Sequence, residues 1–193
     1  MTNVSVSSAK ALAARFHRSR SGLAAVEFAL IAPIMVFMFF AVVEGSDALS
    51  TSRRVDLAAN TLADLTAQET QITADDASDL FKGVKQIIGD TTTTADYRIV
   101  SVIRDPDTDE VIVDWSRDSN GTAPYAKGSV YPGPVEAALI ADAASLIVSE
   151  VRYAYRPPIS RVLALEIDFE RTSTRWPRRA FRVEFCATST NCS

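Results

Sequence analysis

The most distinctive pattern of apolar and polar positions in this chain is a continuous apolar run from Leu23 to Val43. The run holds one charged residue, Glu27, near its start. At about 1.5 Å of rise per residue, a helix of this length spans roughly 31 Å, which is the thickness of the hydrocarbon core of a bilayer. Residues 23–43 therefore predict a transmembrane helix.

The first helix is expected to continue beyond the membrane. After Val43, apolar residues recur every three or four positions to about Ala67, and charged residues occupy the other faces. This spacing predicts a helix of roughly 45 residues that is apolar all round in its first half and amphipathic in its second. An apolar stripe of this kind is usually a packing face, so we expect it to contact the rest of the domain.

A second helix is predicted for residues 74–88. Thr73 is a suitable N-cap, Asp75 and Asp76 interact favourably with the positive end of the helix dipole, and Gly89 is a natural terminator. The apolar residues between these signals fall on one face of the predicted helix.

Strands are predicted in the remaining part of the chain. Residues 97–103 and 111–115 flank a turn and predict a β-hairpin, and residues 145–155 predict a third strand. Residues 116–134 are rich in Gly and Pro and predict a long surface loop.

The clearest period-two alternation lies at residues 163–169 and 181–185. It predicts an antiparallel hairpin with its turn near Thr174. In this register acids face arginines, in the pairs Glu166–Arg182 and Glu170–Arg178, and Ile167 faces Phe181. A turn centred on Arg175 would instead set Glu166 against Glu184, a like-charge pair, so we expect the first register.

The apolar side chains of this hairpin are expected to pack against the amphipathic half of the first helix; they are Leu165, Ile167, Phe181 and Val183. The elements together predict an α+β fold, in which a long N-terminal transmembrane and amphipathic helix packs on an antiparallel β-sheet, with one extra helix. The expected organisation is a basic leader (1–22), a transmembrane helix (23–43) and an extracytoplasmic domain (44–193).

Charge sets the expected topology. The leader contains no acid and four basic residues, Lys10, Arg15, Arg18 and Arg20. A positive flank of this kind keeps the N-terminus in the cytoplasm, so the rest of the chain should cross the membrane. Without the leader the chain has 16 basic and 24 acidic residues, and an acidic exported domain does not indicate nucleic-acid binding.

Glu27 has two interpretations. A carboxylate costs on the order of 2–3 kcal/mol at the middle of a bilayer and less near its edge, which favours a functional role. The alternative is a plain signal anchor in which Glu27 lies in the membrane interface and has no role.

Other chemistry is sparse in the sequence. The only histidine, His17, lies in the leader, and the exported part has no recognisable nucleophile or phosphate-binding motif, so we expect no enzyme activity, no cofactor and no metal. The alternating acids Asp105, Asp107 and Asp109 resemble part of a calcium loop. This segment lacks the glycine at loop position six and has Ser116 at position twelve, which favours a solvated turn.

Two cysteines, Cys186 and Cys192, lie near the C-terminus. In an oxidising compartment they can form a disulfide that closes a short loop. Zinc would require more ligands than two thiols.

The string from Arg20 to Phe28, RSGLAAVEF, resembles the processing site of type IV pilin-like proteins. It is most similar to the TadE/TadF-type pseudopilins of the Tad (Flp-type) pilus. The resemblance implies cleavage between Gly22 and Leu23, with Glu27 at mature position five and Phe28 at position six. The long C-terminal domain is unlike the small major pilin, which implies a minor or tip subunit.

The chemistry of the motif agrees with that role. Glycine has no Cβ and lets a protease approach the backbone closely. Cleavage would free the amine of Leu23, which is largely charged at neutral pH. Glu27 of one subunit could neutralise this amine on a neighbour and fix the axial register of otherwise featureless apolar helices.

The resemblance therefore implies a minor pilin that is cut by a prepilin peptidase and acts in the assembly of an adhesive Tad pilus. Its implied partners are that peptidase, other pilins of the system and the inner-membrane assembly platform. It would be a single-pass protein of the inner membrane with a periplasmic domain, and extracellular after assembly. The alternative is a permanently anchored single-pass protein whose periplasmic domain binds a ligand or partner.

Overall fold

The computed structural model describes residues 21–89, 95–157, 166–188 and 191–192. The chain divides into two compact units between Ser46 and Asp47. One helix, α2 (Ser21–Gln68), contributes its first part to the N-terminal unit and its last part to the second. The predicted extension of the first helix beyond the apolar run is confirmed, because the helix ends at Gln68.

The second part of α2 is amphipathic, as predicted. Its buried face carries small and aliphatic side chains together with one threonine: Val55, Ala58, Ala59, Leu62, Ala63, Thr66 and Ala67. Between them, Leu57 is 55% exposed, and Arg53, which precedes them, is also exposed. The buried positions follow the three- and four-residue spacing that brings side chains to one face of a helix.

A short strand, β1 (Gln71–Thr73), leads into the second helix, α3 (Ala74–Ile88). The predicted helix bounds and caps are confirmed. Thr73 and Asp76 form a capping box, and Gly89 ends the helix in the left-handed conformation with φ of 73°. Hydrogen bonds from Thr73 hold the pKa of Asp76 below its ordinary value.

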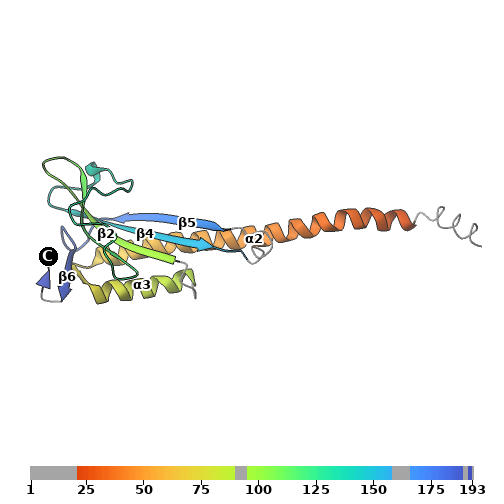
Figure 1. The fold of residues 1–193 in the computed structure, drawn as a ribbon, viewed down its shortest axis with the longest axis horizontal. Helices are drawn as coiled ribbons and strands as arrows, with labels where there is room; N and C mark the ends of the chain where they lie inside the picture. The colour runs from red at the N-terminus through yellow and green to blue at the C-terminus, as the bar shows by residue number, and fades with distance from the viewer. Residues whose placement is uncertain (1–20, 90–94, 158–165, 189–190, 193) are drawn as a thin grey trace, which may run out of the picture. The chain divides into compact units, whose positions relative to one another are not determined.

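Four antiparallel strands form the main sheet, in the order β3-β2-β4-β5 (Figure 1). They are β2 (Ala95–Arg104), β3 (Val111–Asp118), β4 (Ser145–Tyr155) and β5 (Ile167–Arg175). The predicted β2–β3 hairpin and the predicted strand at 145–155 are both confirmed. This sheet, with α2 and α3, makes the α+β fold that the sequence predicts.

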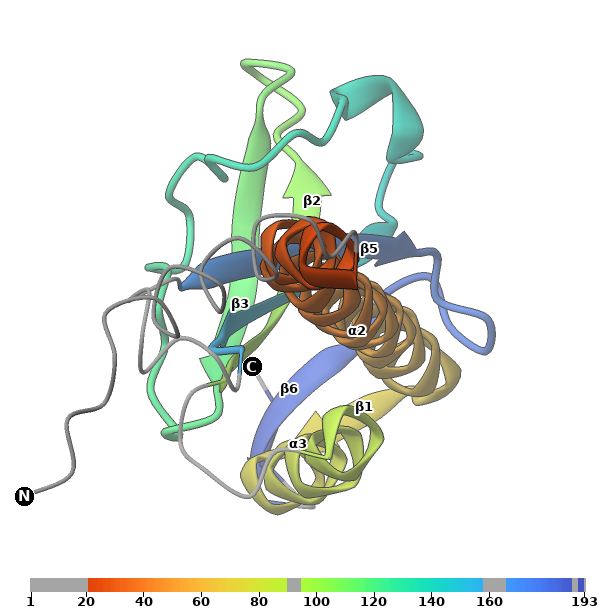
Figure 2. The same ribbon diagram turned by 90° about the vertical axis from the view of Figure 1, so that its right-hand side faces the viewer.

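A second, smaller sheet has the order β1-β6-β7, with β6 (Glu184–Thr188) parallel to β1. The last strand, β7 (Asn191–Cys192), pairs antiparallel with β6, and the Cys186–Cys192 disulfide joins the two. Figure 2 shows β6 and β1 beside α3.

The predicted hairpin between the last two strands is wrong. β5 pairs with β4 instead, with Glu170 opposite Arg152, and β6 belongs to the other sheet. β5 runs on to Arg175, through the position at which the turn near Thr174 was expected. Residues 176–183 then connect β5 to β6, which pairs with β1.

The charged residues of the predicted hairpin have other partners. Ion pairs join Glu170 to Arg152 (3.1 Å), Glu166 to Arg156 (3.3 Å) and Arg182 to Asp114 (2.8 Å), while Arg178 pairs with Asp64. The predicted apolar face is also mostly wrong, since Ile167 is 41% and Phe181 81% exposed, whereas Val183 is buried. Leu165 lies outside the described residues.

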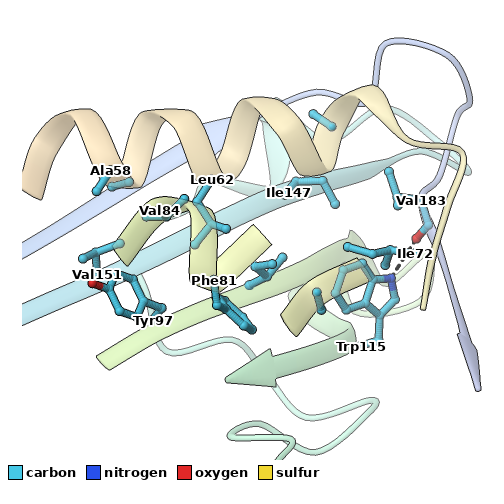
Figure 3. Close-up of a cluster of buried hydrophobic side chains, with 14 of the residues drawn as sticks. Ala58, Leu62, Ile72, Phe81, Val84, Tyr97, Trp115, Ile147, Val151 and Val183 are labelled. Atoms are coloured by element: carbon cyan, nitrogen blue, oxygen red, sulfur yellow. Dashed lines mark hydrogen bonds between the residues drawn. The ribbon is translucent and has the colours of Figure 1, made fainter. Parts of the chain in front are cut away.

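Hydrophobic residues pack on both faces of the main sheet. On one face, α2 and α3 cover side chains such as Tyr97, Ile147 and Val151 (Figure 3). On the other face, a second cluster that includes Val100, Val148 and Tyr131 lies beneath the connection between β3 and β4. The helices and this connection thus enclose the sheet between two apolar layers.

A bulge in β3 links the sheet to the C-terminal segment. Ser101 and Val102 are consecutive, but they pair with Trp115 and Val113, so Asp114 is the extra residue. The bulge sends Trp115 and Val113 to opposite faces of the sheet. Trp115 Nε1 then donates a hydrogen bond to the carbonyl oxygen of Val183 at 2.7 Å.

Two leucines of α2 test the packing of this helix. Leu62 is fully buried in the cluster and Leu57 is 55% exposed. We predict that Leu62→Ala lowers the free energy of unfolding by about 2–5 kcal/mol, because it leaves a cavity. The matched Leu57→Ala change should stay within about 0.5 kcal/mol. Urea titration of the full chain in detergent micelles, followed by tryptophan fluorescence, measures both; equal losses would contradict this packing.

The disulfide gives a second prediction. Intact-mass analysis of the exported protein should find it two protons lighter before reduction than after. Chain-entropy estimates for so short a loop give a contribution of roughly 2–2.5 kcal/mol to the free energy of unfolding. Replacement of both cysteines by serine should remove about this amount. Two free thiols in the exported protein would refute the bond.

Candidate processing and assembly site

The residues of the predicted processing motif lie on the first described turns of α2. Leu23 is 63% exposed and Phe28 is 69% exposed. Leu23 and Glu27 are four positions apart, so they share one face of the helix, one turn from each other. The structure thus places the predicted scissile bond and the predicted charge-pairing acid side by side on one exposed surface.

Gly22 has no packing reason to be glycine among the described residues. A Cβ built on this residue meets nothing within 4 Å. Glycine inside a helix costs roughly 0.5–1 kcal/mol relative to alanine. The described fold therefore gains nothing from this glycine.

Glu27 lies exposed on the helix surface. Its carboxylate takes part in none of the ion pairs that join described residues. The side chains around it in residues 23–43 are almost all exposed as well, and all of them except Glu27 are uncharged. Among the described helices, α2 is long and apolar enough to cross a membrane, and its exposed apolar part fits a single-pass membrane anchor.

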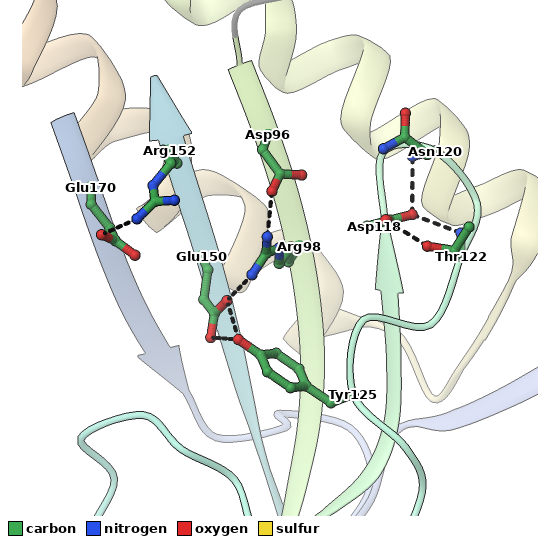
Figure 4. Close-up of polar contacts among 9 residues, drawn as sticks. All are labelled: Asp96, Arg98, Asp118, Asn120, Thr122, Tyr125, Glu150, Arg152 and Glu170. Atoms are coloured by element: carbon green, nitrogen blue, oxygen red, sulfur yellow. Dashed lines mark hydrogen bonds and ion pairs between the residues drawn. The ribbon is translucent and has the colours of Figure 1, made fainter. Parts of the chain in front are cut away.

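A second polar site lies on the outer face of the main sheet, around Glu150 of β4 (Figure 4). Its carboxylate accepts hydrogen bonds from the hydroxyls of Tyr131 (2.6 Å) and Tyr125 (3.0 Å), and Arg98 lies 3.6 Å away. Arg98 also pairs with Asp96 at 2.7 Å. Both tyrosines come from the connection between β3 and β4, so the cluster ties this long connection to the sheet.

The pKa values of the two tyrosines agree with this structural role. Burial, followed by the nearby Glu150 carboxylate, raises the pKa of Tyr131 and of Tyr125. Both hydroxyls therefore keep their protons at neutral pH and donate hydrogen bonds to Glu150. Sequence reasoning missed this cluster, because nothing in the pattern of residues 116–134 indicates which loop side chains reach β4.

A tight turn follows β3. Asp118 accepts hydrogen bonds from the backbone N–H groups of Asn120 and Thr122 and from the Thr122 hydroxyl (Figure 4). Burial raises the pKa of Asp118, but these hydrogen bonds outweigh it and hold the pKa below its ordinary value. The Asp118 carboxylate thus finds its hydrogen-bond donors within the turn, which is typical of an Asx turn that ends a strand.

In the acidic turn between β2 and β3, the carboxylates also contact groups close by in the sequence. The Asp105 carboxylate accepts backbone hydrogen bonds from Asp107 (2.8 Å) and Thr108 (3.3 Å), and Asp109 pairs with Arg104 at 3.5 Å. Within the described parts of the chain, no group of three or more acidic, histidine or cysteine side chains is placed to hold a metal ion. Asp105 and Asp109 therefore have contacts within the turn itself.

Comparison with known proteins finds a family that matches part of the chain. The family described as TadE-like protein matches residues 22–64, a segment that starts at the predicted cleavage site and ends near the C-terminus of α2. No curated protein and no solved structure matches the chain significantly. Residues 22–64 thus form a TadE-like segment, which confirms the family resemblance of the processing motif.

Proposed function

We propose that the chain is a minor pilin, or pseudopilin, that a prepilin peptidase cuts between Gly22 and Leu23 before it acts in the assembly of a Tad pilus. The observation that carries the proposal is the TadE-like match, which begins at Gly22 and includes Glu27 and Phe28. The exposed position of these residues on α2 supports it.

The open surroundings of Gly22 support processing at this residue. A glycine that the described fold does not need is explained by a partner that must approach its backbone. A peptidase that binds an extended backbone at the membrane face is such a partner. Gly22 would then be needed for cleavage by the peptidase and not for the stability of the fold.

The relation between Leu23 and Glu27 supports the role in assembly. Cleavage would leave a charged amine at the positive end of the α2 dipole, surrounded by apolar side chains. Glu27 is the one carboxylate in residues 23–43 and can neutralise the amine of a neighbouring subunit. Because apolar helix faces slide past one another easily, this ion pair would set the axial register between subunits.

Localisation and partners follow from the same proposal. The apolar part of α2 would anchor the protein in the inner membrane, with residues 44–193 in the periplasm until the subunit enters the pilus. Its partners would be the prepilin peptidase, other pilins and the inner-membrane assembly platform. Its role would be structural, so the expectation that it is not an enzyme remains a prediction.

The deciding measurement is the N-terminal residue of the protein purified from membranes of a strain that has the Tad system. Leu23 at the N-terminus supports the proposal. A retained leader would overturn it and favour the permanently anchored protein with a partner-binding domain.

Gly22→Val tests the cleavage site. We predict that it blocks the cut, because a β-branched side chain hinders the approach of the peptidase. Gly45→Val is the matched control, since Gly45 also lies on α2 with nothing within 4 Å of an added Cβ. Electrophoresis should show the Gly22 variant at the size of the precursor and the Gly45 variant at the processed size. Normal cutting of both variants would count against the site.

Glu27→Gln tests the charge pair. The variant should be cut and inserted in the membrane normally, but its incorporation into pili should fall by about tenfold or more, since loss of a register-fixing ion pair of about 1.4 kcal/mol has that effect. Glu136→Gln, at an exposed acid of the C-terminal domain, is the control and should leave incorporation unchanged. Quantitative immunoblots of sheared pili measure both. Wild-type incorporation by the Glu27 variant would remove the pairing role.

A further inference from the structure

A short segment of the C-terminal domain combines exposed aromatic rings with arginines. Residues 175–182, here called the aromatic-basic loop, contain four arginines, two aromatic residues and no acid. Trp176 is 58% exposed and Phe181 is 81% exposed. Aromatic residues and arginine are the residue types enriched where proteins bind partners, so this segment is a candidate binding surface.

The aromatic-basic loop is held in place at several points. Arg178 donates its backbone N–H to the carbonyl oxygen of Ala67 at 2.8 Å, and the carbonyl oxygen of Phe181 accepts from Ser145 at 2.9 Å. Val183, which follows the loop, is fully buried. Figure 2 shows this segment as a loop beside α2 that leads into β6. The two exposed aromatic rings are therefore carried by a backbone that is anchored by hydrogen bonds.

Trp176 is fixed as well as exposed. Its indole Nε1 donates a hydrogen bond to the carbonyl oxygen of Leu139 at 2.8 Å. This bond orients the ring and satisfies its polar atom, while more than half of the side chain stays accessible. A ring of this kind is a pre-organised flat platform, which loses little conformational entropy when a ligand stacks on it.

Three of the four arginines keep donors for a ligand, whereas Arg175 donates to Asn60, to Ser173 and to the carbonyl oxygen of Thr174. Arg178 and Arg182 pair with Asp64 and Asp114, but each pair uses one guanidinium nitrogen, and the two side chains remain 58% and 41% exposed. A guanidinium has five N–H donors in a fork that matches a carboxylate. Arg179 is also exposed.

We propose that the aromatic-basic loop binds an acidic polysaccharide. The Trp176 face would stack on a sugar ring, and the exposed guanidinium groups, Arg179 above all, would bind uronic carboxylates. The proposal goes beyond pilus assembly and requires only that residues 44–193 lie outside the cytoplasm.

Charge density favours a polysaccharide over a nucleic acid. The chain as a whole has a net charge of −4. Duplex DNA carries one negative charge per about 1.7 Å of its axis, so the acidic remainder of the protein would repel it. A polyuronate has one carboxylate per sugar, a charge density that the few arginines of the aromatic-basic loop can match.

The test uses the full-length protein in detergent micelles with immobilised polygalacturonate as the probe. We expect binding that neutral dextran does not compete away. Trp176→Ala should weaken it about tenfold, as loss of one stacking contact of about 1.4 kcal/mol would. Arg179→Ala and Phe181→Ala should each weaken it severalfold, and because both side chains are exposed, these variants keep the fold.

Lys82→Ala is the matched control, because Lys82 is an exposed cation on α3 outside the loop. It should bind as the wild type does. The proposal is overturned if polygalacturonate does not bind, if the loop variants bind normally, or if Lys82→Ala weakens binding equally. Tighter binding to duplex DNA or to phosphatidylglycerol vesicles would also overturn it, in favour of that class. Because binding is measured on the purified chain, a failure to bind would not affect the proposal that the chain is cleaved after Gly22.

Discussion

Burial of one face of α2 against the main sheet is the interaction on which the rest of the C-terminal domain depends. Three alanines, Ala58, Ala59 and Ala63, lie on this face, so the backbone of the helix can come close to the strands. The hydroxyl of Ser149 consequently reaches the main-chain oxygen of Ala59 and donates a hydrogen bond at 2.6 Å. A larger side chain at position 59 would break this bond and push β4 from the helix.

The other parts of the domain pack on this layer of helix and sheet. α3 extends the same apolar cluster through Phe81 and Val84, and the C-terminal segment closes it at Val183. On the opposite face, Glu150 holds the long β3–β4 connection by its two tyrosine hydroxyls. Residues distant in sequence are thereby joined by a few partly buried hydrogen bonds, which are costly to leave unmade where water has little access.

The sequence predicted those features that depend on neighbouring residues. The caps of α3 interact with residues only a few positions away, so Thr73 and Gly89 could be identified as caps from the sequence. Strand pairing is a long-range choice, and the pattern of β5 does not tell whether β4 or β6 lies beside it. The predicted charge pairs, worth about 0.2–1 kcal/mol each, could not decide it, because Glu170 finds Arg152 on β4 just as well. The three-residue β1 and the bulge at Asp114 leave no recognisable pattern at all.

The predicted processing motif has the opposite character, since it is proposed from the sequence while its side chains lie exposed in the described part of the chain. Gly22 packs against nothing, and Leu23 and Phe28 expose most of their surface. Exposed apolar residues cost free energy in water but not in lipid or against another apolar helix. The same helix therefore has two kinds of surface: its second half packs on its own sheet, and its first half exposes apolar side chains, which fits a single-pass membrane anchor.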